Sequence, residues 1–353
     1  MKKLLFLLIP TLFVAACSQP TITEEDDSKS TEVAGAPAAS ELEVYTTVYP
    51  LAYFTKRIGG ERVNVESIYP PGGNVHVFEP TQQDMIAFAE SDLLFYIGLG
   101  LEGFIDSAKN TLSEENVELV ATADAISDEE LESGQSHGEE SLENHEHEHH
   151  DEENHDNHAE EESHDDDSHK EEGHDEHDHG SVDPHLWISP VLSQKLAESI
   201  KNSLVEADAE GAELYEANFD ELVSELVQLD QSFAELSDQV ENKTFFVSHA
   251  AFGYLADTYG FEQVAVAGLN SEDEPSQKEL TEIVDLAKEK EIDYIVFEQN
   301  VSSDLTEIIQ KEVGAEAIEM HNLSVLTQEN LDNGETYFTL MEKNRDVLET
   351  ILK

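Results

Sequence analysis

The chain has 353 residues, enough for about two domains, and its hydrophobic content of 39% is enough to build ordinary cores. It carries 80 acidic against 18 basic side chains, so its formal net charge at pH 7 is −62. This charge excludes nucleic acid as a partner, because phosphate backbones are bound by basic surfaces, and it favours cations instead.

The N-terminus has the features of an exported protein that is attached to a membrane. Residues 1–16 form a predicted signal peptide, with a basic start followed by an apolar run too short to span a bilayer comfortably. The run ends in Val14-Ala15-Ala16-Cys17, which resembles the lipobox of bacterial lipoproteins. The resemblance implies cleavage before Cys17 and a membrane anchor of more than one acyl chain on that residue. An ordinary secreted protein with a chance cysteine here is the alternative.

Residues 17–42 are expected to form a flexible tether, because they are rich in small, hydroxyl and acidic residues and lack apolar periodicity. An N-terminal α/β lobe is expected over residues 43–188. Thr81 and Asp84 have the spacing of a helix-capping pair. The predicted strands are 43–48, 63–69, 93–97 and 117–120, and the predicted helices are 49–58, a segment after Thr81, and 102–111. Strands that alternate with helices favour a parallel sheet.

An acidic, histidine-rich stretch interrupts this lobe between residues 126 and 180. Twelve of the 16 histidines lie between His137 and His179, together with twenty acidic residues and one lysine. Such a composition has almost nothing to bury, so it predicts a disordered insertion. Imidazole and carboxylate are also metal ligands, so it predicts a low-affinity collector of metal ions, with a solvated acidic spacer as the alternative. The collector histidines are His145, His147, His149, His150, His174, His177 and His179.

The C-terminal half repeats the α/β pattern after a helical connector at residues 189–240. Apolar residues recur every three or four positions over 212–236, which predicts an amphipathic helix of roughly 35–40 Å. A second α/β lobe is expected over residues 241–353. Its predicted strands are 244–247, 263–267, 294–297 and 315–320, and its predicted helices are 250–259, 276–290, 302–313 and 335–352. The sequence therefore predicts two Rossmann-like α/β lobes joined by a long, rigid helix.

Four histidines lie outside the predicted insertion: His76, His185, His249 and His321. The first three follow predicted strands or the loops after them, and His249 is expected to open the helix at 250–259. Ligand groups in open α/β sheets gather beyond the carboxyl ends of the strands, so these three could share one cleft. Any one of them alone would more often be a surface or core histidine.

Three motifs resemble those of one family. Residues 74–81 (Asn-Val-His-Val-Phe-Glu-Pro-Thr), 183–187 (Asp-Pro-His-Leu-Trp) and 248–256 (Ser-His-Ala-Ala-Phe-Gly-Tyr-Leu-Ala) resemble, in order, motifs of the zinc and manganese solute-binding proteins of ABC importers, the ZnuA-like or cluster A-I family. The resemblance extends from Glu43 to Lys353. It implies that His76, His185 and His249 bind a metal ion in the cleft between the lobes.

The metal and its remaining ligand are less closely specified by the resemblance. Three imidazoles suit Zn²⁺ better than Mn²⁺, which prefers oxygen ligands. Some family members have an acidic fourth ligand where this chain has Ser324, so the candidates here are water, His321 or a histidine of the insertion. Glu79 and Asp183 are candidates to orient the ligating imidazoles through hydrogen bonds.

The resemblance implies an extracellular receptor that captures Zn²⁺ and delivers it to the transmembrane permease subunit of an ABC importer, with no enzymatic activity. We expect a monomer that is lipid-anchored through Cys17 on the outer face of the cell membrane of a Gram-positive bacterium. The alternatives are a receptor for Mn²⁺ or another divalent metal, a zinc hydrolase that uses three histidines and a water, and a surface adhesin.

Overall fold

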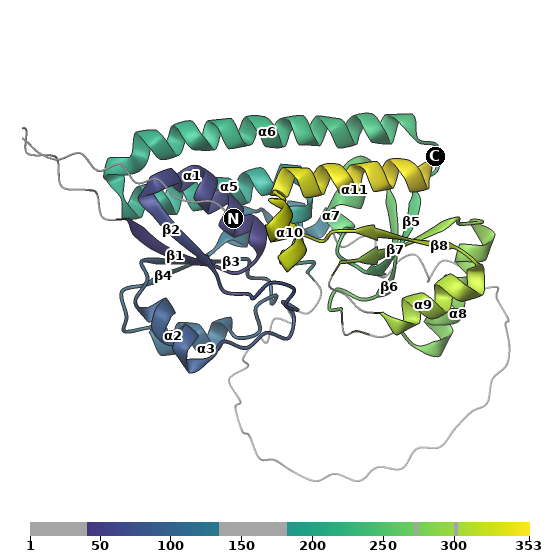
Figure 1. Ribbon diagram of the computed structural model, residues 1–353, viewed down its shortest axis with the longest axis horizontal. Coiled ribbons are helices and arrows are strands. Elements are labelled where there is room, and N and C mark those ends of the chain that lie inside the picture. Colours follow the sequence, from purple (N-terminus) through teal and green to yellow (C-terminus); the bar gives the residue numbers. More distant parts are fainter. Residues whose placement is uncertain (1–40, 134–181, 272, 274, 300–302) are drawn as a thin grey trace, which may run out of the picture. The chain divides into compact units, whose positions relative to one another are not determined.

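The computed structural model describes residues 41–133, 182–271, 273, 275–299 and 303–353 (Figure 1). The predicted signal peptide, Cys17, nearly all of the tether and the collector histidines lie outside these residues. None of the helices in the described ranges is long and apolar enough to cross a membrane.

The N-terminal lobe is built on a four-stranded parallel sheet in the order β2-β1-β3-β4. Its first strand begins at Leu42, one residue earlier than expected. Thr81 caps helix α2 as predicted, since its hydroxyl accepts from the Asp84 amide while the Asp84 carboxylate accepts from the Thr81 amide. The strands are β1 (Leu42–Thr46), β2 (Val63–Ser67), β3 (Leu93–Tyr96) and β4 (Glu118–Ala121), and the helices are α1 (Tyr49–Gly59), α2 (Gln82–Ala89) and α3 (Ile105–Leu112).

The lobe continues further into the expected insertion than the composition indicated. Helix α4 (Asp128–Ser133) follows β4, and Ile126 before it is buried in the core. Glu130 forms an ion pair with Lys195, with 2.8 Å between the carboxylate oxygen and the ammonium nitrogen. The prediction of disorder from residue 126 is therefore wrong for residues 126–133, because a few apolar side chains and one ion pair tie them to the lobe.

The C-terminal lobe repeats the same topology, with a parallel sheet in the order β6-β5-β7-β8. His249 is the last residue of β5 and does not open a helix as expected. The chain turns at Ala251, whose amide donates to the His249 carbonyl at 2.9 Å, and the helix starts only at Gly253. The strands are β5 (Thr244–His249), β6 (Glu262–Ala267), β7 (Tyr294–Glu298) and β8 (Glu316–Met320), and the helices are α7 (Gly253–Tyr259), α8 (Gln277–Glu289), α9 (Asp304–Val313), α10 (Gln328–Asn333) and α11 (Tyr337–Leu352).

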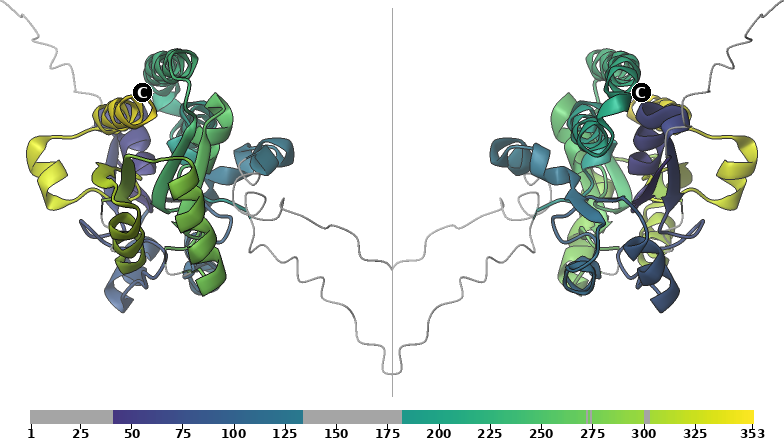
Figure 2. Two further views of the ribbon diagram at one scale, coloured as in Figure 1. Left: turned by 90° about the vertical axis from the view of Figure 1, so that its right-hand side faces the viewer. Right: turned by 90° about the vertical axis from the view of Figure 1, so that its left-hand side faces the viewer.

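Two long helices connect the lobes, α5 (Pro190–Ala207) and α6 (Ala212–Gln239). The 28-residue α6 packs against α1 and α5 of the first half and against α7 and α11 of the second, and Figure 2 shows it beside α11. Most of the predicted apolar stripe is buried, through Leu222, Leu226, Leu229, Phe233 and Leu236. At the start of the helix the prediction of a buried Leu214 is wrong, because Tyr215 is buried there and Leu214 is exposed. One continuous core cluster includes side chains of the first lobe, α5, α6, α7 and α11. The predicted two-lobe α/β architecture with a long linking helix is confirmed.

Candidate metal centre

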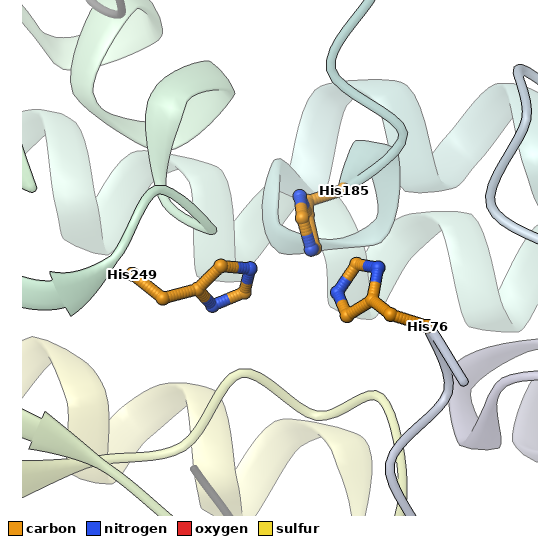
Figure 3. Close-up of side chains that lie close together, drawn as sticks. All are labelled: His76, His185 and His249. Carbon is orange, nitrogen blue, oxygen red and sulfur yellow. The ribbon is translucent and has the colours of Figure 1, made fainter. Parts of the chain in front are cut away.

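Three imidazoles from three separate segments point toward one another (Figure 3). His76 lies in the loop after β2, His185 immediately precedes the short 3₁₀ turn Leu186–Ile188, and His249 ends β5. One ring nitrogen from each lies within 4.8 Å of the other two. Their ring centroids are 4.9 to 5.6 Å apart. Across the described ranges, this is the one group of three or more histidine, cysteine or acidic side chains with such spacing.

His185 is held by the carboxylate two residues before it. Asp183 Oδ1 lies 2.8 Å from the His185 amide nitrogen, from which it accepts, and 2.8 Å from His185 Nδ1. Both side chains are almost completely buried. A proton on Nδ1, donated to Asp183, leaves the lone pair of Nε2 free for a metal ion. Asp183 therefore takes the orienting position that was predicted for it.

His249 is held in the same way by a residue that the sequence did not reveal, Glu298 at the end of β7. Glu298 Oε2 lies 2.9 Å from His249 Nδ1, and both side chains are buried. Strands β5 and β7 are neighbours in the sheet, so their carboxyl ends bring the two residues together. The sequence does place a carboxylate directly after the apolar run 294–297, which could have suggested a site residue. Only the strand order identifies His249 as its partner.

His76 is held mainly through its loop. The Asn74 side-chain oxygen accepts from the His76 backbone amide at 3.0 Å. The Asn74 side-chain nitrogen donates to the hydroxyl of Ser271 in the other lobe at 3.3 Å. Phe78 anchors the far side of the loop by packing edge-on against Tyr69 and Phe104. His76 is also more exposed than the other two histidines.

The three imidazoles differ in their affinity for protons. Burial, with repulsion from His185 and His249 added to it, lowers the pKa of His76 from 6.5 to about 3. Burial also disfavours the charge on His249, but the attraction of Glu298 and its hydrogen bond outweigh this effect and raise the pKa of His249. His249 Nε2 lies 3.1 Å from the Leu269 carbonyl, as expected of an imidazolium that donates from both nitrogens. A metal ion bound at His249 Nε2 would take the place of this contact with the Leu269 carbonyl.

The remaining predicted site residues lie apart from the three imidazoles. His321 is buried, and its Nδ1 accepts from the Leu323 amide at 2.7 Å while its Nε2 lies 3.2 Å from Asn330 Oδ1. Glu79 is exposed. Ser324 lines a small cavity together with His76 and His249.

Two parallel-sheet lobes that share a buried histidine cluster define a class of two-lobed binding protein. The profile of the family described as "ZnuA: Zinc-uptake complex component A periplasmic" matches residues 44–351, and the chain belongs to this family. The resemblance inferred from the three motifs is thereby confirmed.

Individual relatives agree with this assignment. The zinc-binding lipoprotein AdcA of Streptococcus pneumoniae (strain ATCC BAA-255 / R6) is 34% identical over 99% of this chain, which spans 60% of the length of AdcA. The high-affinity zinc uptake system protein ZnuA of Bacillus subtilis (strain 168) is 33% identical over 97% of this chain and 94% of its own. The crystal structure of the Zn(II)-bound ZnuA-like domain of Streptococcus pneumoniae AdcA has a TM-score of 0.65 and 29% identity, covering 89% of this chain and 99% of that domain.

The charge state of the centre leads to a prediction for the metal-free chain. His249 should keep its second proton to a higher pH than a free histidine, because the Glu298 carboxylate stabilises the imidazolium. His76 should stay neutral far below pH 6.5, because burial and its neighbours oppose its charge. Side-chain NMR of the imidazole nitrogens, titrated from about pH 4 to 9, measures both.

The Glu298→Gln variant is the control for this titration. It keeps the size of the side chain but removes the negative charge, so the largest effect that raises the pKa of His249 is lost and this pKa should fall. An unaltered His249 titration in this variant would contradict the assigned role of Glu298.

Proposed function

We propose that this chain is the extracellular zinc receptor of an ABC importer, which captures Zn²⁺ with His76, His185 and His249 and delivers it to the membrane permease. The observation that carries the proposal is the convergence of three ring nitrogens within 4.8 Å in a member of a zinc-uptake family. Three imidazoles with a fourth position open to another ligand suit the tetrahedral preference of Zn²⁺. Zn²⁺ is cargo here, and the protein makes or breaks no bond in its substrate.

Charge balance supports a dication as the cargo. Asp183 and Glu298 are buried carboxylates, each bonded to the Nδ1 of one proposed ligand, and neither belongs to the group of three converging ring nitrogens. With neutral imidazoles, their two negative charges offset the two positive charges of Zn²⁺, so the bound ion is not an uncompensated buried charge. Each carboxylate also makes its imidazole a stronger donor.

A water molecule is the proposed fourth ligand. A cavity of about 10 Å³ lies beside His76 and His249, and Ser271, Asn322 and Ser324 line it with polar groups. This volume is close to the minimum for one water, and the polar lining can hold one. The two ring nitrogens of His321 already have other partners. A zinc-bound crystal structure tests the proposal, and a His321 nitrogen on the ion would refute it.

The proposals that the chain is attached to the membrane and delivers zinc there rest on its sequence and on the named relatives. AdcA is named a lipoprotein, and Val14-Ala15-Ala16-Cys17 is the matching lipidation signal in this chain. We therefore propose that Cys17 carries the lipid and that the monomeric receptor works on the outer face of the membrane of a Gram-positive cell. Release of a Cys17→Ala variant into the medium, measured by fractionation, tests the anchor.

The site assignment predicts the outcome of a zinc titration. Removing His76, His185 and His249 together (each →Ala) should weaken tight zinc binding by far more than roughly 100-fold, since even changes behind the ligands cost 10- to 100-fold. The measurement is calorimetry in competition with a chelator. The background is a chain that lacks residues 134–181, so that the collector histidines do not contribute.

The described residues on either side of the deleted segment lie close enough to be joined. The Tyr254 hydroxyl lies 3.4 Å from the Leu131 carbonyl and 2.9 Å from the Asp183 carbonyl, so the two ends of the removed segment are close and a short Gly-Ser linker can join them. The deleted chain with all three histidines intact is the control. Retention of tight binding by the triple variant would overturn the site assignment.

The histidine-rich tract gives a separate prediction, since we propose that it concentrates zinc near the tight site. Deleting residues 134–181 from the full chain should lower the number of weakly bound Zn²⁺ ions but leave one tight ion. The weak ions should be lost below about pH 6 as the imidazoles of the tract become protonated. Calorimetry of both chains at two pH values measures this, and an unchanged stoichiometry would favour the spacer alternative.

A further inference from the structure

The segment that follows β8 runs through the centre of the molecule. Residues 321–326, here called the crosspiece, are all buried although they form no helix or strand. The crosspiece bonds to the first lobe at two points, because the Ser324 carbonyl accepts from the Tyr49 amide at 2.9 Å and the Leu326 carbonyl accepts from the Gly72 amide at 3.0 Å. Gly72 lies in the loop that carries His76.

The backbone of the crosspiece is held in an unusual conformation. Leu323 has a φ of 59°, in the left-handed region that L-residues with large side chains rarely adopt. His321 stabilises this turn by accepting from the Leu323 amide through Nδ1 at 2.7 Å. The Asn344 side chain bonds both the amide and the carbonyl of His321, at 2.8 and 2.7 Å. These contacts fix the position of Asn322 between His321 and Leu323.

Asn322 bonds to the supports of two of the three imidazoles. Its side-chain nitrogen donates to Glu298 Oε2 at 3.0 Å, the same oxygen that lies 2.9 Å from His249 Nδ1. Its backbone carbonyl accepts from Trp187 Nε1 at 2.7 Å. Trp187 is two residues after His185, and the centroids of their rings are 5.4 Å apart.

The orientation of the Asn322 amide follows from its other partner. Its Oδ1 accepts from the Ser324 amide at 3.0 Å and from the Ser324 hydroxyl at 2.8 Å. Because Oδ1 already has two donors, the NH₂ group must face Glu298, where only an acceptor is available. The amide is 5% exposed, so water does not readily replace these bonds.

We propose that Asn322 is a positioning residue for metal capture, which locks the Glu298 carboxylate and through it the ring of His249. The inference rests on the proposed zinc-receptor function. Asn322 is not one of the three converging imidazoles, although it lines the small cavity beside His76 and His249, and its side-chain nitrogen is bonded to Glu298, so we assign its effect to Glu298. Without the Asn322 amide, the only side chain besides His249 that still bonds the carboxylate is Ser248, whose hydroxyl lies 3.3 Å from Glu298 Oε1. His249 is then held less firmly toward His76 and His185. The site then loses the preorganisation that gives tight binding.

A double-mutant cycle in the full chain tests this mechanism. The variants are Asn322→Ala, Glu298→Gln and the two together, and the measurements are zinc affinity by chelator competition and the visible spectrum of bound Co²⁺. Asn322→Ala should weaken tight binding by about 10- to 100-fold and change the Co²⁺ spectrum, which reports ligand geometry. The zinc affinity of the double variant should lie within about twofold of the affinity of Glu298→Gln, because both changes break the same chain of contacts.

The control is Asn218→Ala on α6, which also removes a side-chain amide that donates to one acceptor, here the Ile58 carbonyl of α1 at 2.9 Å. This variant should keep the affinity and the Co²⁺ spectrum of the unmodified chain. An Asn322→Ala chain with unmodified affinity and spectrum, or a loss that adds in full to that of Glu298→Gln, would overturn the proposal.

A second variant decides the question if Asn322→Ala does not fold. Ser324→Ala removes the hydroxyl that bonds the Asn322 side-chain oxygen and that also lines the cavity beside His76 and His249. If this hydroxyl acts through Asn322, the smaller loss of affinity should disappear in the Glu298→Gln background. A loss that persists in that background would place the effect of Ser324 elsewhere and refute the pathway. Failure of the unmodified chain to bind zinc tightly would instead refute the zinc-receptor function itself.

Discussion

The hydrogen bond between a buried carboxylate and the Nδ1 of an imidazole is the interaction on which the rest of the site depends. It occurs twice, between Asp183 and His185 at 2.8 Å and between Glu298 and His249 at 2.9 Å. Each bond selects the tautomer and the direction of the ring, and each supplies a negative charge without placing an oxygen on the ion. A site with nitrogen ligands can therefore be neutral overall when it holds a dication, which is costly to achieve in a buried position by other means.

The fold provides these two bonds by different routes. Asp183 is local, because it lies two residues before His185, and its carboxylate also accepts from the His185 backbone amide. Glu298 is 49 residues from His249 and reaches it only because β5 and β7 are adjacent parallel strands whose carboxyl ends coincide. The crosspiece then connects Glu298, and Trp187 beside His185, to the loop of His76. The site is thus a property of two sheets and one irregular segment, not of any single element.

This difference explains what the sequence could and could not predict. The alternation of strands and helices, the Thr81 cap and the long apolar stripe of α6 are local patterns, and they gave the architecture. The three motif histidines could be selected by family resemblance, and Asp183 was found because it stands beside one of them. Glu298 was missed because the pairing of β5 with β7 is not local. Helix α4 was missed because the position of residues 126–133 depends on tertiary contacts of Ile126 and Glu130.

The packing of the long helix bears on how an ion can enter and leave. Helix α6 contributes buried side chains along its whole length, and Arg57 and Arg62 of the first lobe bind Glu225 and Asp208 through paired hydrogen bonds. A rigid-body rotation of one lobe would have to break this shared core, where each large buried side chain contributes roughly 2–3 kcal/mol. The loop of His76 is less constrained, because its imidazole is the most exposed of the three and, within the described residues, has no carboxylate behind it. Local motion of this loop therefore costs less free energy than separation of the lobes, and His185 and His249 can remain aligned while it moves.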